Sequence, residues 1–376
     1  METELKDENT ERSKPCPQKS QPEVAPDDAS TMDDLPLLKS DSNRMATENI
    51  QELEKKFAAF VRNDVYGTMG RGELQLAKKA LLGFALVTLL PIRVMLAMII
   101  LFFYYAICRI CTLFSAPNRD VEKEQEDFAH MGGWSRAVIV RSGRFLSRVM
   151  LFVFGFYWIR ETYGILEQPK DKSFSQNEGK NQSGKPERPG AIISNHVSYL
   201  DILCHMSSCF PSFVAKWPNF LLLVSSGVVT ERVREANQNT SAPMMMLFPE
   251  GTTTNGDFLL PFKTGAFLAG TPVLPVILRY PYQRFSPAWD SISGVRHVIF
   301  LLCQFINYIE VKRLPVYYPS QEEKDNPKLY AYNVRWLMAR EGDLVMSDIG
   351  LAEKRVYHAA LNGNNSLPSI LHQKDD

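Results

Sequence analysis

The sequence predicts an α/β domain that follows an N-terminal membrane-inserted helical segment. From Ala191 onward, short apolar stretches of strand length alternate with helical stretches, a pattern typical of strands and helices packed in layers. Before that domain, residues 80–108 are almost entirely apolar and are interrupted only by Pro91 and Arg93. A run of this length indicates a helix that enters a lipid bilayer.

The elements of the α/β domain are placed by their apolar runs. A buried strand is expected at residues 191–193, directly after the turn residues Pro189 and Gly190. A last helix is expected at 327–340, where apolar residues fall on one face. The further apolar stretches of the alternating pattern lie at 212–216, 244–248, 273–278, 298–309 and 314–318.

Residues 80–108 carry enough apolar side chains to favour insertion into a membrane. Sixteen of them are Leu, Ile, Val or Phe, which together favour insertion by about 7 kcal/mol, against about 3 kcal/mol for placing Arg93 in the bilayer. As one straight helix the segment would be about 43 Å long, more than the roughly 30 Å of the hydrocarbon core. A tilted helix and a re-entrant hairpin kinked at Pro91 both satisfy this length.

Two amphipathic segments flank this run. Before it, apolar residues at helical spacing predict a helix that could lie on a membrane or on the main domain. These residues are Ile50, Leu53, Phe57 and Val61. After it, residues 149–159 are apolar but too short to span a bilayer, and three arginines at helical spacing precede them. They are Arg141, Arg144 and Arg148. This second segment is either an interfacial helix or a solvated basic face against the main domain.

Charge and cysteine content exclude several classes of protein. The chain of 376 residues has no net charge, but residues 1–45 hold eleven acidic and six basic residues and few large apolar ones, which predicts a disordered acidic tail. No basic stripe with interleaved aromatic residues is present, so no nucleic-acid partner is expected. Cys108 and Cys111 form a CxxC pair without a second pair or a histidine cluster, so no metal site is expected.

These patterns divide the chain into six expected segments. The α/β domain occupies residues 190–345 and carries the residues of chemical interest. The others are the disordered acidic tail at 1–45, an amphipathic helix and linker at 46–79, membrane-inserted and interfacial helices at 80–160, a polar loop at 161–189 and a C-terminal tail at 346–376.

A histidine and an aspartate, His196 and Asp201, stand five residues apart where the first strand gives way to a helical pattern. On one α-helix, residues five apart point about 140° away from each other, so the two cannot meet within a shared helix. The histidine is therefore expected on the strand-to-helix turn, facing Asp201 one turn into the helix. Such a pair predicts a general base and the residue that orients it. Alternatively, Ser198 and Asp201 form a capping box and the histidine is an ordinary turn residue.

A second polar turn follows the apolar run at 244–248. It contains Glu250, Gly251 and Thr252, and Lys263 follows a few residues later. A glycine-containing polar turn at the end of a buried strand places backbone N–H groups and hydroxyls at one point, as in sites that hold phosphate. An ordinary connecting loop, with Lys263 facing solvent, fits the same residues.

Three motifs in a fixed order identify a family. HxxxxD at 196–201, FPEGT at 248–252 and PVLPV at 272–276, behind a membrane segment, resemble the glycerolipid acyltransferase superfamily, over about residues 189–319. A closer likeness to the plant lysophosphatidylethanolamine acyltransferases runs from about 37 to 364 and includes the stretches RNDVYGTMG and LFPEGTTTNGDFLLPFKTGAFLAGTPVLPVIL. The superfamily implies an α/β fold with a mixed sheet flanked by helices.

The resemblance implies acyl transfer from acyl-CoA to the free hydroxyl of a lysophospholipid such as lysophosphatidylethanolamine. His196 would take the hydroxyl proton, and Asp201 would fix the tautomer of the imidazole and stabilise the imidazolium. Glu250, Gly251 and Thr252 would hold the glycerophosphate head of the acceptor, with Lys263 as a nearby cation. The expected partners are acyl-CoA, lysophospholipid and a membrane, without a cofactor or metal. The resemblance also implies an endoplasmic reticulum membrane, with the catalytic domain facing the cytosol.

The chain departs from the superfamily between the first two motifs. Only 48 residues separate the aspartate of HxxxxD from the glutamate of FPEGT, fewer than the resemblance implies, and the glycine-to-arginine block that helps bind acceptor phosphate is missing after Lys216. Arg232 and Arg234 have the wrong spacing to replace it, and both are expected on a helix. We hypothesise that residues 217–230 replace a lost segment. The alternative to an active enzyme is a catalytically impaired membrane protein of the same fold.

Overall fold

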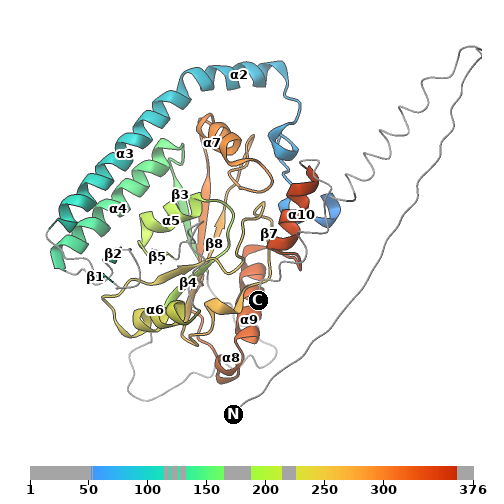
Figure 1. Ribbon diagram of the computed structural model, residues 1–376. Helices are drawn as coiled ribbons and strands as arrows, with labels where there is room; N and C mark the ends of the chain where they lie inside the picture. The colour runs from blue at the N-terminus through green and yellow to red at the C-terminus, as the bar shows by residue number, and fades with distance from the viewer. Residues whose placement is uncertain are drawn as a thin grey trace, which may run out of the picture. The chain divides into compact units, whose positions relative to one another are not determined.

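The computed structural model of the protein (Figure 1) describes residues 52, 54–113, 118–119, 126–127, 133–164, 188–213 and 226–361. All of them belong to one unit that spans residues 51–376. The predicted acidic tail at 1–45 and residues 165–187 of the predicted polar loop lie outside the described residues. The segment boundaries given above remain predictions.

Helices and strands alternate from Ala191 onward as the sequence predicts. The helix predicted at 327–340 is α9, and it begins where the side chain of Asn326 accepts a hydrogen bond from the main-chain N–H of Leu329. The helices are α2 Leu76–Val87, α3 Leu89–Thr112, α4 Gly133–Val153, α5 Leu200–Ser208, α6 Ser226–Gln238, α7 Gly294–Leu302, α8 Gln321–Asp325, α9 Pro327–Gly342 and α10 Leu351–Leu361, with short 3₁₀ helices η1 Ala58–Phe60, η2 Thr68–Gly70 and η3 Thr264–Ala266. The strands are β1 Asn118–Arg119, β2 Glu126–Asp127, β3 Ile159–Tyr163, β4 Ala191–Ser194, β5 Ser212–Phe213, β6 Met245–Leu247, β7 Phe258–Leu259, β8 Val273–Arg279, β9 Ile309–Arg313 and β10 Val345–Met346.

A six-stranded sheet forms the centre of the domain. Its strands stand in the order β3, β9, β8, β4, β6, β5. Strands β8, β4, β6 and β5 are parallel to one another, while β9 runs antiparallel to β8 and parallel to β3. Parallel neighbours need crossover connections, and α5 and α6 supply them between β4, β5 and β6. The mixed sheet flanked by helices is confirmed.

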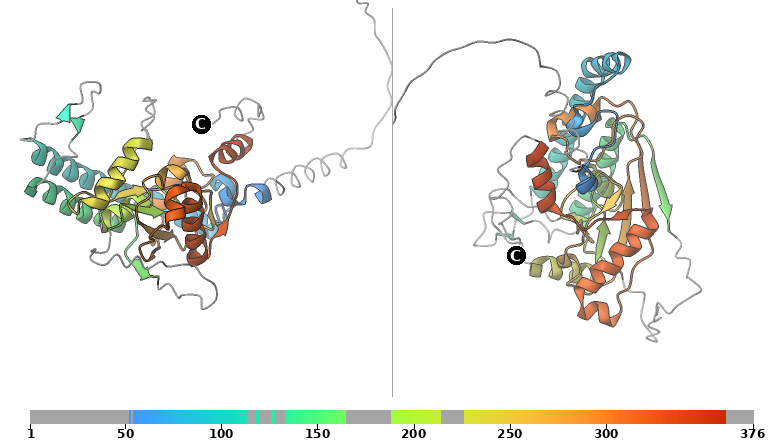
Figure 2. Two further views of the ribbon diagram at one scale, coloured as in Figure 1. Left: turned by 90° about the horizontal axis from the view of Figure 1, so that it is seen from below. Right: turned by 90° about the vertical axis from the view of Figure 1, so that its right-hand side faces the viewer.

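Helices cover both faces of this sheet (Figures 1 and 2). On one face Ile192 packs in a cluster with Leu200 of α5. On the other face Ile193 packs with Val233 of α6 and Val334 of α9. Because successive strand residues point to opposite faces, a strand buried on both sides needs an uninterrupted apolar run, which is what β4 has.

Two predicted stretches differ from the structure. The apolar stretch predicted at 298–309 is divided between the end of α7 and the start of β9. The stretch at 314–318 forms one isolated antiparallel bridge, between Val273 and Tyr317, instead of a strand. Pro315 explains this difference, because a proline has no N–H to donate to a strand ladder.

Helices α2 and α3 form the apolar segment predicted at 80–108. Residues 76–112 are long and apolar enough to cross a membrane, and no other helix in the described part of the chain meets both criteria. The two helices meet at a bend (Figure 1) at Thr88, whose hydroxyl donates to the carbonyl oxygen of Phe84. Pro91 lies in the first turn of α3, where its missing N–H costs no helical hydrogen bond. The bend therefore lies about one turn before Pro91, the position of the kink in the hairpin alternative.

Arg93 of α3 is buried against the main domain instead of facing lipid. Its guanidinium donates to the main-chain carbonyls of Leu302, Gln304 and Phe305, at and just beyond the end of α7. Carbonyls at the end of a helix lack an intrahelical partner, so Arg93 satisfies them. The guanidinium is thus paired within the protein, while most of its neighbours on α3 are apolar and exposed. Exposed large side chains of α2 and α3 include Phe84, Val87, Ile92, Met95, Met98, Leu101, Phe102, Phe103 and Tyr105.

Helix α4 lies alongside α3 in both views (Figures 1 and 2). Arg148 donates to the main-chain carbonyls of Phe156 and Tyr157, in the turn that follows the helix. Arg141 and Arg144 are exposed. The predicted basic stripe is therefore divided, since one arginine closes a turn and two face outward.

The segment before α2 packs on the main domain, which decides between its two predicted positions. Phe57, Phe60 and Val61 are buried in one cluster with Tyr357 of α10. The chain forms the 3₁₀ helix η1 at 58–60, so the predicted helix does not continue to Val61. The other two residues of that predicted helix, Ile50 and Leu53, lie outside the described residues.

Candidate active site

The histidine and the aspartate of HxxxxD meet as the sequence predicts. His196 lies on the loop after β4, and Asp201 lies in the first turn of α5. Nδ1 of His196 is 2.9 Å from Oδ2 of Asp201. The imidazole side chain is 20% exposed and the aspartate side chain is fully buried. The Nδ1 edge of the ring is therefore held inside the protein, while part of the ring remains accessible to solvent.

The carboxylate of Asp201 accepts three further hydrogen bonds. Oδ2 accepts from the main-chain N–H groups of Val197 and Ser198 at 2.8 and 2.9 Å. Oδ1 accepts from the hydroxyl of Tyr280 at 2.6 Å. Donors of this kind stabilise the charged form of a buried carboxylate. Asp201 thus orients His196 and also ties down the start of α5, whereas the Ser198 hydroxyl makes no hydrogen bond with the described residues, so the predicted capping box is only half formed.

The imidazole of His196 is also held from its face. Its ring stacks on that of Phe248, with centroids 4.2 Å apart and planes 21° apart. When Nδ1 donates its proton to Asp201, the lone pair lies on Nε2, which is the state of a general base. Burial raises the pKa of Tyr280, so its hydroxyl remains a donor to Asp201.

Glu250 of the FPEGT turn holds the histidine loop. The side chain is buried, Oε1 accepts from the main-chain N–H of His196 at 2.7 Å, and Oε2 accepts from that of Leu260 at 2.9 Å. Burial raises the pKa of Glu250 to about 8. Both oxygens are engaged with the protein's own backbone, so this geometry favours a positioning role for Glu250 over direct contact with an acceptor.

Gly251 and Lys263 lie together at the surface of the same turn. Gly251 has a φ of +71°, and a Cβ placed on it would lie 3.0 Å from Cε of Lys263. The lysine side chain therefore crosses the glycine, and both residues are exposed. Thr252 follows them and is half-buried. Of the four predicted substrate-binding residues, these three lie near one another on the outer side of the turn, and Glu250 lies inside.

A second buried charge, Lys354 of α10, holds the turn from the other side. Its ammonium donates to the carbonyl oxygen of Thr253 at 2.7 Å, to its hydroxyl at 2.8 Å and to the carbonyl oxygen of Trp289 at 3.3 Å. The main-chain N–H of Trp289 in turn donates to the carbonyl oxygen of Val197 at 2.8 Å. Burial lowers the pKa of Lys354 to about 8. This lysine belongs to the segment expected to be a C-terminal tail.

Comparison with known proteins assigns this site to a family. A family model described as Acyltransferase matches residues 175–279. Lysophospholipid acyltransferase LPEAT1 of Arabidopsis thaliana is 56% identical over 414 aligned positions, which cover 100% of both chains. This chain belongs to the lysophospholipid acyltransferase family.

Other members of the lysophospholipid acyltransferase family match part of their own length. LPEAT2 of Arabidopsis thaliana is 30% identical over 58% of this chain and 40% of its own, and lysophosphatidylcholine acyltransferase 1 of Danio rerio is 30% identical over 70% of this chain and 50% of its own. The crystal structure of the 1-acyl-sn-glycerophosphate acyltransferase PlsC from Thermotoga maritima shows 17% identity and a TM-score of 0.37, covering 67% of this chain and 97% of that chain.

This acyltransferase is shorter than its full-length relative. The alignment with LPEAT1 has 414 positions against 376 residues here, so about 38 positions hold a residue of the relative and none of this chain. Residues 217–225 of the predicted replacement segment, 217–230, lie outside the described residues. Arg232 and Arg234 lie on α6, as predicted, and Arg232 pairs with Glu235 at 3.0 Å. Val233 between them packs in the cluster with Ile193 of β4 and Val334 of α9, so α6 lies on the sheet face opposite to α5.

Three residues of the acyltransferase site were not found from the sequence. Phe248 was assigned to a strand, Tyr280 follows one, and Lys354 was placed in a tail. Phe248 carried a signal, because it is the first letter of FPEGT. Tyr280 and Lys354 carried none, since each approaches the motifs through the fold from a distant part of the chain.

Proposed function

We propose that this acyltransferase transfers an acyl group from acyl-CoA to the free hydroxyl of a lysophospholipid, with lysophosphatidylethanolamine as the acceptor. The observation that carries the proposal is the contact of 2.9 Å between Nδ1 of His196 and a fully buried Asp201. This contact directs the proton-accepting Nε2 away from the aspartate. LPEAT1 of Arabidopsis thaliana, a lysophospholipid acyltransferase that aligns with this chain over its full length, supports the substrate class.

The reaction needs one residue that acts first as a general base and then as a general acid. Nε2 of His196 accepts the proton of the acceptor hydroxyl as its oxygen attacks the thioester carbonyl. The carbon–sulfur bond then breaks, and the imidazolium returns the proton to the departing thiolate of CoA. Asp201 stabilises the imidazolium between these steps, and the donors around Asp201 hold its carboxylate in place. The products are the acylated phospholipid and free CoA.

The outer side of the FPEGT turn is the proposed site of the acceptor's phosphate. Gly251 brings exposed backbone to the surface, and the ammonium of Lys263 lies over it. Thr252 adds a hydroxyl at the same point. An exposed cation beside backbone N–H groups attracts a phosphate monoester or diester. Glu250 would act indirectly, by holding the loop that carries His196.

The membrane helices support a location at a bilayer. Helices α2 and α3 present large exposed apolar side chains, whose contact with water would be unfavourable. We further propose the endoplasmic reticulum membrane, with the domain that carries His196 on the cytosolic side. The cytosolic side of the membrane is chosen on chemical grounds, because acyl-CoA is a cytosolic substrate.

The decisive experiment compares the wild-type protein with His196→Ala in purified membranes. Labelled lysophosphatidylethanolamine and acyl-CoA are supplied, and both labelled product and free CoA thiol are measured. Loss of the general base should lower the rate by about a hundredfold or more. His205→Ala is not a suitable control because His205 is buried, so Tyr332→Phe on the exposed surface of α9 serves instead. Equal incorporation by wild type and His196→Ala would exclude the catalytic role.

A second candidate function is that of a catalytically impaired protein of the same fold. The observation that favours it is the missing stretch between HxxxxD and FPEGT, together with the roughly 38 unmatched positions against LPEAT1. A folded wild-type protein with no more activity than His196→Ala would establish it. Amplifying and sequencing the transcript then tests the origin of the missing stretch, since a uniform longer product would contradict an alternative transcript.

A further inference from the structure

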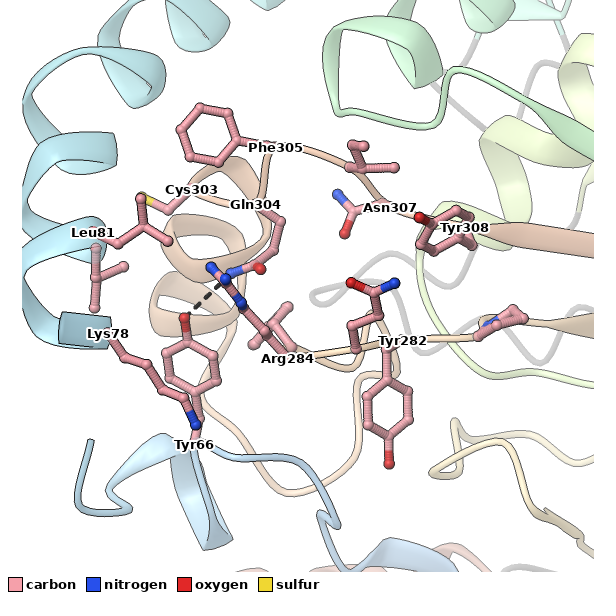
Figure 3. Close-up of a pocket in the computed structure, with 15 residues that line it drawn as sticks. Tyr66, Lys78, Leu81, Tyr282, Arg284, Cys303, Gln304, Phe305, Asn307 and Tyr308 are labelled. Carbon is pink, nitrogen blue, oxygen red and sulfur yellow. Dashed lines mark hydrogen bonds between the residues drawn. The ribbon is translucent and has the colours of Figure 1, made fainter. Parts of the chain in front are cut away.

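A cleft outside the site of His196 opens between α2 and two loops of the main domain (Figure 3). Its volume is about 270 Å³. One wall is the face of α2 with Lys78, Leu81 and Leu82, and the others are residues 281–285 after β8 and residues 303–308 between α7 and β9. None of the residues proposed for catalysis or acceptor binding lines it. The cleft is therefore a separate candidate binding site.

Two cations line this cleft without an acidic partner. Figure 3 shows Lys78 reaching in from α2 and Arg284 from the loop after β8, with Tyr66 between them in this view. Within the described residues neither cation is within ion-pair distance of a carboxylate. Arg62, close by in the fold, shows the contrast, because it pairs with Asp64 at 2.6 Å. The cleft thus has an unbalanced positive charge that favours an anionic ligand.

The polar groups between the cations are arranged by the protein itself. The side-chain amide of Gln304 donates to the hydroxyl of Tyr66 at 3.2 Å, and the amide of Asn307 donates to the main-chain carbonyl of Phe154 at 2.7 Å. These amides are therefore committed to the walls of the cleft. Lys78 and Arg284 remain the groups available to a ligand.

The surroundings of the cleft select the kind of anion. Leu81 and Leu82 lie on the helix whose outer side is apolar and exposed, and on the facing loop Phe305 and Ile306 are 44% and 45% exposed. Arg93 of α3, the helix that follows α2, donates to the carbonyls of Gln304 and Phe305 in that same loop, so the loop is held against the apolar helices beside the cations. A cationic cleft at the edge of a membrane-facing apolar surface matches a molecule with a phosphate head and acyl chains.

We propose that this cleft binds the headgroup of an anionic phospholipid of the surrounding bilayer, with Lys78 and Arg284 contacting the phosphate region and the acyl chains lying against α2 and residues 305–306. The site is independent of the acyl-transfer reaction. It holds the protein at a defined depth and orientation relative to lipid headgroups. Binding can therefore be measured whether or not the chain is catalytically active.

The test measures lipid binding to the full chain purified in detergent micelles. Native mass spectrometry counts retained dioleoyl phosphatidic acid against dioleoyl phosphatidylcholine across a titration. The pocket variant is Lys78→Gln with Arg284→Gln, and the matched control is Arg71→Gln with Lys79→Gln, which removes two exposed cations from the same part of the surface but outside the cleft. Loss of two charge-assisted contacts should weaken binding of phosphatidic acid about tenfold in the pocket variant alone.

Several outcomes would overturn the proposal. It fails if phosphatidic acid is retained no better than phosphatidylcholine, or if the pocket and control variants bind phosphatidic acid equally. Inorganic phosphate and ADP form further arms, and if either displaces the lipid and binds alone through Lys78 and Arg284, the ligand is a soluble phosphate and the lipid assignment is wrong. Circular dichroism of both variants checks that the fold is retained, which is expected because neither cation has a described partner to lose.

Discussion

Two buried charges hold the FPEGT turn, and they differ in where they come from. Glu250 belongs to the motif itself and accepts hydrogen bonds from the backbone of His196 and Leu260. Lys354 comes from α10 near the far end of the chain and donates to Thr253 and Trp289. Both are ionisable groups buried where only their hydrogen bonds offset the loss of water. The comparison teaches that a catalytic loop can be fixed by its own motif on one side and by a remote helix on the other.

The two charges also differ in what their removal leaves behind. Without Glu250, two main-chain N–H groups lose their acceptor inside the protein. Without Lys354, carbonyl oxygens lose a donor, and a carbonyl with two lone pairs tolerates this better than an N–H does. We therefore expect the glutamate to be the more important of the two for stability, and both to matter for activity.

The largest effect is expected for Glu250→Ala. Two buried N–H groups left without acceptors should lower the free energy of unfolding by about 3 kcal/mol. The His196 loop would shift as well, which should lower kcat by about a hundredfold. Denaturant unfolding and the acyl-transfer assay measure the two effects. Glu250→Gln keeps one good acceptor, so its stability and its kcat should fall between those of Glu250→Ala and the wild type. If Glu250→Gln is as impaired as Glu250→Ala, one remaining acceptor oxygen is not enough to hold the loop.

A smaller effect is expected for Lys354→Met, which keeps the length of the side chain but removes its charge. The lost hydrogen bonds and the relieved burial of an ammonium act in opposite directions, so the free energy of unfolding should change by less than about 1 kcal/mol. Looser packing of the turn should lower kcat about tenfold and leave KM nearly unchanged.

Arg355→Met is the matched control for this variant, because Arg355 is the next residue on α10 and is exposed. It should change neither stability nor rate. If Lys354→Met and Arg355→Met give the same kcat, the remote helix does not position the turn, and the comparison reduces to Glu250 alone.

The pH dependence of stability should distinguish the two charges by sign. Burial raises the pKa of Glu250 from 4.5 to about 8, so the native state binds the extra proton and stability falls as pH rises through that window. Burial lowers the pKa of Lys354 from 10.5 to about 8, so the unfolded state binds the extra proton and stability rises with pH above about 8. Each slope is about 1.4 kcal/mol per pH unit at most.

Thermal unfolding of the wild type and of each variant between pH 5 and pH 10 checks this expectation. Glu250→Gln should flatten only the falling limb, and Lys354→Met only the rising limb. If both variants follow the wild-type curve in parallel, neither group titrates in the native protein as its burial implies.

The same contrast explains how far the sequence could predict the site. The contact between His196 and Asp201 was predicted correctly because the two residues are only five apart. Their relative position depends on the local geometry of one strand-to-helix turn. The mixed sheet followed from apolar runs and from family resemblance. Glu250 was predicted to hold the head group of the acceptor, and this role stays a prediction. Its hydrogen bonds to the backbone of His196 and Leu260 could not be foreseen, because a motif shows which residues are present and not which way a side chain points.

The remaining errors have one physical cause, which is burial by distant segments. Arg93 was assigned a cost in lipid, yet the carbonyls that satisfy it lie some two hundred residues further along the chain. Lys354 and Tyr357 looked like residues of a polar tail, yet both are buried, Tyr357 beside Phe57 and Phe60. Periodicity along a helix cannot reveal a partner that only the tertiary fold provides.

The smallest expected effect is that of Tyr280→Phe, a third residue that reaches the motif from a distance. It removes one of the four hydrogen bonds to Asp201, worth about 1 kcal/mol, and should lower kcat several-fold. KM should stay nearly unchanged, because Tyr280 acts through Asp201, whose carboxylate orients His196. Tyr332→Phe, exposed on α9, is the control. If Tyr280→Phe and Tyr332→Phe give the same kcat, the hydroxyl of Tyr280 does not position Asp201, and the main-chain donors of Val197 and Ser198 are sufficient to hold the carboxylate in place.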